Sequence, residues 1–245
     1  MCRLMGYVAE NATTLEEIAG PDFVQFTELS KKHGDGWGIS TSDRGSSPSL
    51  LVEPARAKES EKYSKAVKGL TSNAALLHLR WATLGLSINE GNTHPFLYEE
   101  MSFIHNGGIM PPESLDRYID QDLLDSMRGN TDSEKYFYSL VTQIRKLGPI
   151  PGLIAGVNEI KTNLIYSSIN AILLTPTKMI VVCEHNNDRI PDDEGPDYYE
   201  LYYRKDAKGV IVASSGWNQA GWTLLPNHHI LVVDRIQQEF EVIAL

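Results

Sequence analysis

Apolar residues follow two different spacings along this chain. Up to residue 147, short apolar runs that predict strands alternate with stretches in which apolar positions recur every three and four residues, as one buried helix face requires. Beyond residue 168 nearly every apolar run has the length and composition of a strand. The expected helices are 59–68, 113–127 and 133–147, and the expected strands are 2–9, 36–41, 75–83, 101–105, 169–175, 178–185, 198–205, 210–214, 230–234 and 240–245.

The order of these elements predicts the fold class. Short strands joined by short turns pair as antiparallel neighbours. Helices concentrated before residue 147 and strands after residue 168 therefore favour an α+β protein built from layered antiparallel sheets. The chain has 245 residues and no internal repeat, so we expect one domain over residues 1–245.

Composition removes several classes of function. No apolar run approaches the roughly 18 residues that a membrane-spanning helix needs, so no membrane partner is expected. The net charge is −10 and no basic run occurs, which argues against nucleic-acid binding. The N-terminus lacks the features of a secretory signal, which favours a cytoplasmic location. Cys2 and Cys183 predict neither a disulfide framework nor a metal site, and Gly-Asp-Gly-Trp-Gly at 34–38 lacks the spacing of a dinucleotide site, so no cofactor is expected.

Cys2 is the first candidate for chemistry. Removal of Met1 would leave a cysteine with a thiol and a free α-amino group. The amine titrates near ~7.7–8.0 and the thiol near ~8.5, so at neutral pH the amine can act as the base for its own side chain. Any protein can carry cysteine at the second position, and the downstream motifs have to decide between these interpretations.

Two downstream motifs follow expected strands. Arg80 ends the strand 75–83, where its guanidinium offers a rigid set of donors for a carboxylate or simply forms a surface ion pair. Asn106 and Gly107 follow the strand 101–105, where a side-chain amide and a backbone N–H would make an oxyanion hole. Asn-Gly is also a common hairpin turn.

Two further motifs have ordinary structural explanations. Thr131 and Glu134 fit a capping box at the start of the last expected helix. Asp132, the second residue of this motif, is free to face away and receive an ammonium group. The loop around His94 is restricted by the proline that follows it and could form a pocket wall.

Taken together, the motifs resemble one family. Met-Cys, GDGWGI, HLRWATLG, NTHPF, IHNGG and NTDSE occur in the order and approximate spacing of the class II glutamine amidotransferases, which are N-terminal-nucleophile (Ntn) hydrolases. The resemblance covers residues 1–147 well and continues faintly over 210–233. It implies a four-layer αββα sandwich.

The resemblance also implies roles for individual residues. Cys2 would be the nucleophile and its freed amine the general base, and Asn106 and Gly107 would form the oxyanion hole. Arg80 would bind the α-carboxylate of the substrate and Asp132 its α-ammonium. Pocket-lining positions are matched by Trp81, Thr83 and His94.

The implied reaction is cleavage of a γ-glutamyl amide through a Cys2 thioester. The substrate would be glutamine or a small γ-glutamyl compound, and the products would be glutamate and ammonia or another amine. The large synthases of the family often carry a histidine where this chain has Leu84. The pattern looks more like the free-standing members, among them the γ-glutamyl hydrolase of ergothioneine synthesis.

Several alternatives remain open at this stage. The chain could act alone or as a homo-oligomer, or it could be a glutaminase subunit that serves a separate acceptor enzyme. It could be a binding or regulatory module of the same fold that keeps Met1 and so lacks the base. A different Ntn acylase would also begin Met-Cys, although it is not expected to combine Arg-Trp-Ala-Thr with His-Asn-Gly.

Overall fold

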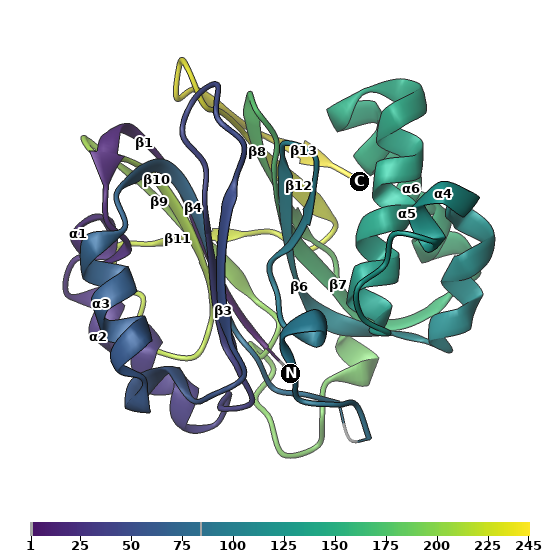
Figure 1. Ribbon diagram of the computed structural model, residues 1–245, viewed down its shortest axis with the longest axis horizontal. Helices are drawn as coiled ribbons and strands as arrows, with labels where there is room; N and C mark the ends of the chain where they lie inside the picture. The colour runs from purple at the N-terminus through teal and green to yellow at the C-terminus, as the bar shows by residue number, and fades with distance from the viewer. Residues whose placement is uncertain (1, 84) are drawn as a thin grey trace.

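Two antiparallel β-sheets face each other in the computed structural model, and each carries helices on its outer face (Figure 1). The structure describes residues 2–83 and 85–245. Buried apolar side chains such as Leu4, Leu76, Ile104 and Ile172 come from both sheets and form one cluster between them. Of two other clusters, one lies between the first sheet and its helices and the other lies between the second sheet and its helices. The prediction of an α+β fold, a four-layer αββα sandwich, is confirmed.

The first sheet carries the N-terminal strand near its centre. Strand β1 pairs antiparallel with β4 on one side and with β10 on the other. Within the described chain this sheet has seven strands in the order β11 (Thr223–Leu225), β9 (Leu201–Asp206), β10 (Gly209–Ser214), β1 (Arg3–Thr13), β4 (Ser72–Leu79), β2 (Trp37–Thr41) and β3 (Ser49–Glu53).

The second sheet carries the strand that contains Asn106. Its described part has six strands in the order β13 (Phe240–Ala244), β12 (His229–Asp234), β8 (Lys178–Cys183), β7 (Ile165–Leu174), β6 (Met101–Met110) and β5 (Phe96–Tyr98). Strand β6 was expected to stop at residue 105 but continues to Met110, pairing with β7 throughout. The alternative in which Asn106 and Gly107 form a hairpin turn is therefore wrong.

The helices over the first sheet include two that the sequence did not predict. Helix α3 (Glu61–Gly69) matches the expected helix 59–68 closely. Helices α1 (Leu15–Ala19) and α2 (Asp22–Glu28) are only a few residues long, so few turns are available to establish a periodic pattern. Thr14 caps α1 in a complete capping box with Glu17.

Of the two helices expected over the second sheet, one is interrupted and the other is present. The predicted helix 113–127 is instead a 3₁₀ helix, Pro112–Tyr118, followed by α4 (Gln121–Leu124). The two are separated because the backbone N–H of Asp120 donates to the hydroxyl of Thr142. Helix α5 (Asp132–Leu147) agrees with the prediction within one residue.

Helix α6 (Pro149–Asn163) was missed because two prolines and two glycines obscure its helical character. Pro149 lies in the first turn, where the missing N–H costs nothing. A Cβ on Gly152 would lie 2.6 Å from the backbone of Ile144, so this glycine allows α6 to pack closely on α5.

The packing of β2 against the His94 loop can be tested at Gly38, where the two backbones approach closely. A Cβ at position 38 would lie 2.0 Å from the carbonyl oxygen of His94. Gly38→Ala should therefore lower the free energy of unfolding by about 3 kcal/mol, because the backbone of β2 or of the His94 loop must shift. Gly69→Ala is the matched control, since no atom lies within 4 Å of its Cβ position. Urea denaturation of both variants decides the point, and equal stabilities would contradict the packing described.

Candidate active site

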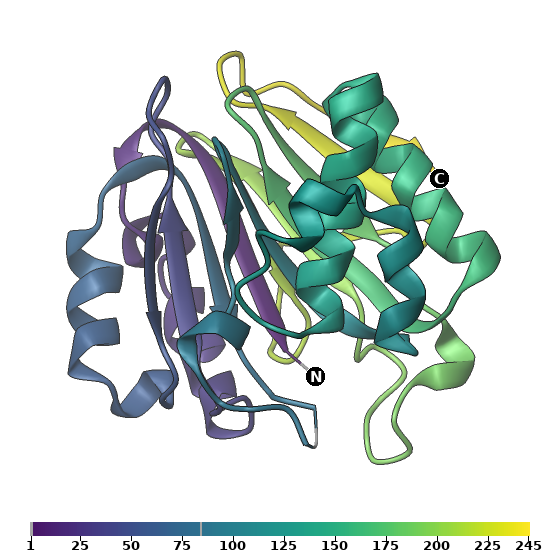
Figure 2. The ribbon, with the colours of Figure 1, turned by 45° about the vertical axis from the view of Figure 1, so that its right-hand side comes forward.

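The register of β1 on β4 places Cys2 beside Arg80. Arg3 pairs with Leu79 and Leu4 with His78, so the residue before Arg3 lies across from the residue after Leu79. The Cys2 thiol lies 3.7 Å from the carbonyl oxygen of Trp81. Figure 2 shows that β1 begins at one end of the two sheets.

Arg80 is buried, which rules out the surface ion pair that its motif also allowed. Its side chain is 3% exposed, and one terminal nitrogen donates to the carbonyl of Ser87 at 3.2 Å. The other terminal nitrogen, Nη1, is buried and has no hydrogen-bond partner among residues 2–83 and 85–245. A buried cation with an unused donor is suited to bind a carboxylate.

Asp35 holds the backbone around Arg80 in place. Its N–H donates to the Arg80 carbonyl at 3.0 Å, and its carboxylate accepts from the N–H of Ala82 at 2.8 Å. The Arg80 N–H donates in turn to the Gly36 carbonyl at 2.8 Å. The Gly-Asp-Gly segment thus fixes the end of β4. Sequence reasoning assigned Asp35 no role, because its partners lie more than 40 residues away.

Gly107 is required by the close approach of β7. A Cβ there would lie 1.7 Å from the carbonyl oxygen of Ser168. The neighbouring Asn106 is completely buried, and among the residues that the structure describes neither its side-chain nitrogen nor its side-chain oxygen has a hydrogen-bond partner. An unpartnered buried amide is costly, so its presence beside Gly107 indicates a group reserved for a ligand or water.

Asp132 is the first residue of α5 and is held against the strand that carries Gly107. One carboxylate oxygen accepts from the N–H of Ile109 at 2.9 Å, and within the described chain the other has no partner. Thr131 caps the helix by accepting from the N–H of Glu134. The full capping box is wrong, because the Glu134 carboxylate accepts instead from the N–H groups of Arg128 and Gly129.

Asn92 joins the loop after β4 to the segment that leads into α5. Its side-chain nitrogen donates to the side-chain oxygen of Asn130 at 2.9 Å, and its oxygen accepts from the Asn130 N–H at 3.0 Å. A Cβ on Gly129 would lie 2.3 Å from this oxygen, so the glycine makes the contact possible. Asn92 and Asn130 each begin one of the quoted motifs, yet their contact was not foreseeable without the fold.

His94 lies beside the pocket but is packed between rings. Its imidazole stacks on His78 with ring centroids 4.0 Å apart and lies 4.5 Å from Phe96. Burial lowers the pKa of His94 well below its ordinary value, and burial lowers the pKa of His78 to about 3. Both rings are therefore neutral, so neither adds a positive charge beside Arg80 and Cys2.

One small pocket collects most of the predicted site residues. Of the eight, only Asn106 does not line it and lies buried next to Gly107 instead. Met1 and Leu84, which also entered the sequence argument, lie outside the described residues. The described lining residues are Cys2, Arg80, Trp81, Ala82, Thr83, Leu86, Asn92, His94, Gly107, Thr131, Asp132 and Ser133.

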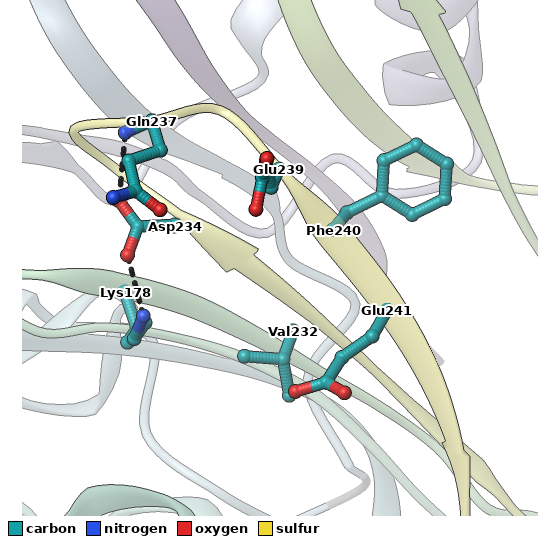
Figure 3. A pocket seen from close by; sticks show the side chains of 7 residues that line it. All are labelled: Lys178, Val232, Asp234, Gln237, Glu239, Phe240 and Glu241. Carbon is teal, nitrogen blue, oxygen red and sulfur yellow. Dashed lines mark hydrogen bonds and ion pairs between the residues drawn. The ribbon is translucent and has the colours of Figure 1, made fainter.

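Another hollow lies at the other end of the sheets, beside the β12–β13 turn (Figure 3). Lys178 donates to Asp234 at 2.6 Å there, and Glu239 and Glu241 lie at its rim. Its described lining contains no cysteine, serine or threonine. No group of three or more metal-ligating side chains occurs in the part of the chain that the structure describes. Over the same residues, no helix is long and apolar enough to cross a bilayer.

Comparison with known proteins decides the family. Residues 1–186 match the family model for class-II glutamine amidotransferases. The chain belongs to this family. A glutamine amidotransferase class-II domain protein from Silicibacter pomeroyi has the same fold, with a TM-score of 0.70 over all of this chain and 99% of that one, at 17% identity.

Two curated relatives of this amidotransferase match over part of their length. One is a probable glutamine amidotransferase, DUG3, from Saccharomyces cerevisiae, 30% identical over 128 residues, or 49% of this chain and 36% of the yeast protein. The other is the gamma-glutamyl-hercynylcysteine sulfoxide hydrolase of Mycobacterium tuberculosis, 30% identical over 117 residues, or 44% of this chain and 50% of that protein. The aligned part is thus half or less of either relative.

The neutral histidines beneath the pocket predict a dependence of stability on pH. The pKa values of His78, His94 and His105 are all lowered by burial. Unfolded histidines titrate near ~6.5, so below that pH the unfolded chain binds more protons than the folded one. The free energy of unfolding should fall by about 1.4 kcal/mol per pH unit for each such histidine. Urea denaturation between about pH 7.5 and 5.5 measures this, and a constant stability would show that the rings are already charged.

Proposed function

We propose that this amidotransferase hydrolyses γ-glutamyl amides through a thioester on Cys2. The observation that carries the proposal is the convergence of Cys2, Arg80, Gly107 and Asp132 on one pocket from four separate parts of the chain. Cleavage of a γ-glutamyl amide requires a nucleophile, donors for the oxyanion, a cation for the α-carboxylate and an anion for the α-ammonium.

Recognition of the glutamyl end follows from its two charges. Its α-carboxylate would bind Nη1 of Arg80, the buried donor that lacks a partner. Its α-ammonium would bind the carboxylate oxygen of Asp132 that is not bonded to Ile109. Fixing this end sets the γ-carbonyl next to the thiol, and such positioning can lower a reaction barrier by several kcal/mol.

The oxyanion would be stabilised by the side chain of Asn106 and the N–H of Gly107. The Asn106 amide is buried and unpartnered, so binding the oxyanion would supply its missing hydrogen bond. Donors fixed in a water-poor site stabilise developing charge without reorganisation.

Activation of the thiol requires a base close to Cys2. Burial raises the pKa of the Cys2 thiol, although the Arg80 cation opposes this effect. A free α-amine on Cys2, exposed by loss of Met1, would accept the thiol proton as sulfur attacks the carbonyl carbon. The amine would then return the proton to the departing nitrogen when the C–N bond breaks, and water would hydrolyse the thioester to glutamate.

The substrate class is proposed from the relatives. Residues 1–245 would form one domain, and a small γ-glutamyl compound would be a better substrate than glutamine, because contacts with a larger leaving amine can stabilise the transition state. The alternative is a glutaminase subunit. The same fold also occurs within a longer chain, since the match covers 49% of the phosphoribosylpyrophosphate amidotransferase of Bacillus subtilis, with a TM-score of 0.66 at 17% identity. Glutamate release that requires a second protein would favour this alternative.

The first test is glutamate release from glutamine and a panel of γ-glutamyl amides. Protein that has lost Met1 should release glutamate, whereas Cys2→Ala and a form that retains Met1 should not. The first variant lacks the nucleophile and the second lacks the free amine that serves as the base. Cys183→Ala is the matched control, since Cys183 is buried between the sheets and away from the pocket. Full activity with Met1 retained would exclude the proposed base.

The second test concerns Asp132. Asp132→Asn should raise KM for glutamine about 10- to 100-fold, because a charge-assisted hydrogen bond contributes about 1.5–3 kcal/mol. Hydrolysis of glutaramate, which is glutamine without its α-amine, should be little changed. Asp125→Asn removes a carboxylate of the same type from an exposed position and serves as the control. An equal loss on both substrates would show that Asp132 does not bind the ammonium.

A further inference from the structure

The oxyanion segment of β6 is held to α5 at both of its ends. Before the segment, Nδ1 of His105 lies 2.9 Å from the hydroxyl oxygen of Ser133 in the first turn of α5. After it, the N–H of Ile109 donates to Asp132 at 2.9 Å. Residues 106–108 therefore lie between two contacts with the helix turn that carries Asp132.

The same segment is held from the other side by β7. Nε2 of His105 lies 3.2 Å from the carbonyl oxygen of Ser168, and the hydroxyl of Ser168 donates to the carbonyl of Asn106 at 2.9 Å. The pairing of β6 with β7 shifts register between Gly108 and Ile109. A register shift disrupts the ladder locally, so side-chain contacts must supply the alignment that backbone pairing loses there.

The partners of His105 fix its tautomer. A carbonyl oxygen can only accept, so Nε2 carries the proton and donates to Ser168. Nδ1 is then an acceptor and receives the hydroxyl proton of Ser133. Burial lowers the pKa of His105, which is consistent with one neutral tautomer. The ring also meets the edge of Tyr136, with centroids 5.2 Å apart.

The direction of the side chains separates this residue from the chemistry. Successive residues of a strand point to opposite faces. His105 faces α5, whereas Asn106 shares the face of Ile104, which packs in the cluster between the two sheets. His105 therefore touches neither the nucleophile nor the pocket, yet it contacts the two elements that must stay aligned on either side of the oxyanion segment.

We propose that His105 is a positioning residue that sets the oxyanion donors of β6 at a fixed spacing from Asp132, acting through Ser133 on α5 and Ser168 on β7. This inference rests on the proposed function, because it assigns the spacing to the two ends of one γ-glutamyl group. A shift of about 1 Å between groups that hold a substrate can reduce turnover by 10²-fold. Loss of the His105 contacts should accordingly slow the reaction more than it weakens the fold.

The experiment compares Ser133→Ala with Ser139→Ala. Ser139 is a buried serine of the same helix whose hydroxyl donates only to the carbonyl of Tyr136 in its own helix. Ser133→Ala should lower kcat for glutamine by about 10- to 100-fold, with a smaller change in KM, whereas Ser139→Ala should stay within about twofold of the wild type. The kcat of His105→Gln, which retains a donor toward Ser168, should lie between the kcat values of Ser133→Ala and His105→Ala.

A second measurement does not depend on activity. Hydrogen–deuterium exchange of the peptide that contains residues 105–110 should become faster in Ser133→Ala but not in Ser139→Ala. Equal kcat values and equal exchange in the two serine variants would overturn the proposal. If the wild type released no glutamate from any γ-glutamyl amide, the proposed function would fail instead, and the exchange result would still decide whether His105 aligns β6 with α5.

Discussion

The antiparallel pairing of β1 with β4 is the constraint on which the site depends. Its register sets Cys2 beside Arg80, so the proposed nucleophile and a buried cation are neighbours by backbone geometry. Because side chains alternate between the faces of a strand, a shift of one residue would turn Cys2 toward the outer helices. The apolar residues of β1 and β4 between the two sheets, such as Leu4 and Leu76, oppose that shift.

The site concentrates buried polar groups that the protein itself does not satisfy. Nη1 of Arg80 and both side-chain atoms of Asn106 are buried without partners. Such groups lower stability unless a ligand or water completes them. Around them, the contacts of Asp35, Asn92 and His105 hold the backbone segments that carry the site. The backbone is thus held in place, while the unpartnered polar groups remain available to a ligand.

Local patterns predicted those parts of the fold that depend on local interactions. The periodicity of residues 133–147 gave α5 within one residue, and the apolar runs gave the central strands of both sheets. The helix over 113–127 was wrong because a contact between Asp120 and Thr142 interrupts it. Helix α6 was missed because its glycines are explained only by close packing on α5.

The site was predictable as a set of residues but not as an arrangement. Resemblance to a family named Cys2, Arg80 and Asp132, and the structure places them in one pocket. The contacts that hold them, such as Asp35 with Ala82 and Asn92 with Asn130, join segments 38 or more residues apart. No spacing rule along the chain reveals contacts of that length, because they arise only when strands and loops far apart in the sequence come together in the fold.

The most direct measurement is a crystal structure of the Cys2→Ala variant, prepared without Met1 and soaked with glutamine. The account predicts that the α-carboxylate binds Nη1 of Arg80, that the α-ammonium binds Asp132, and that the γ-carbonyl oxygen points between the side chain of Asn106 and the N–H of Gly107. Glutamine bound in the reverse orientation, or bound elsewhere with this pocket occupied by water, would contradict the account.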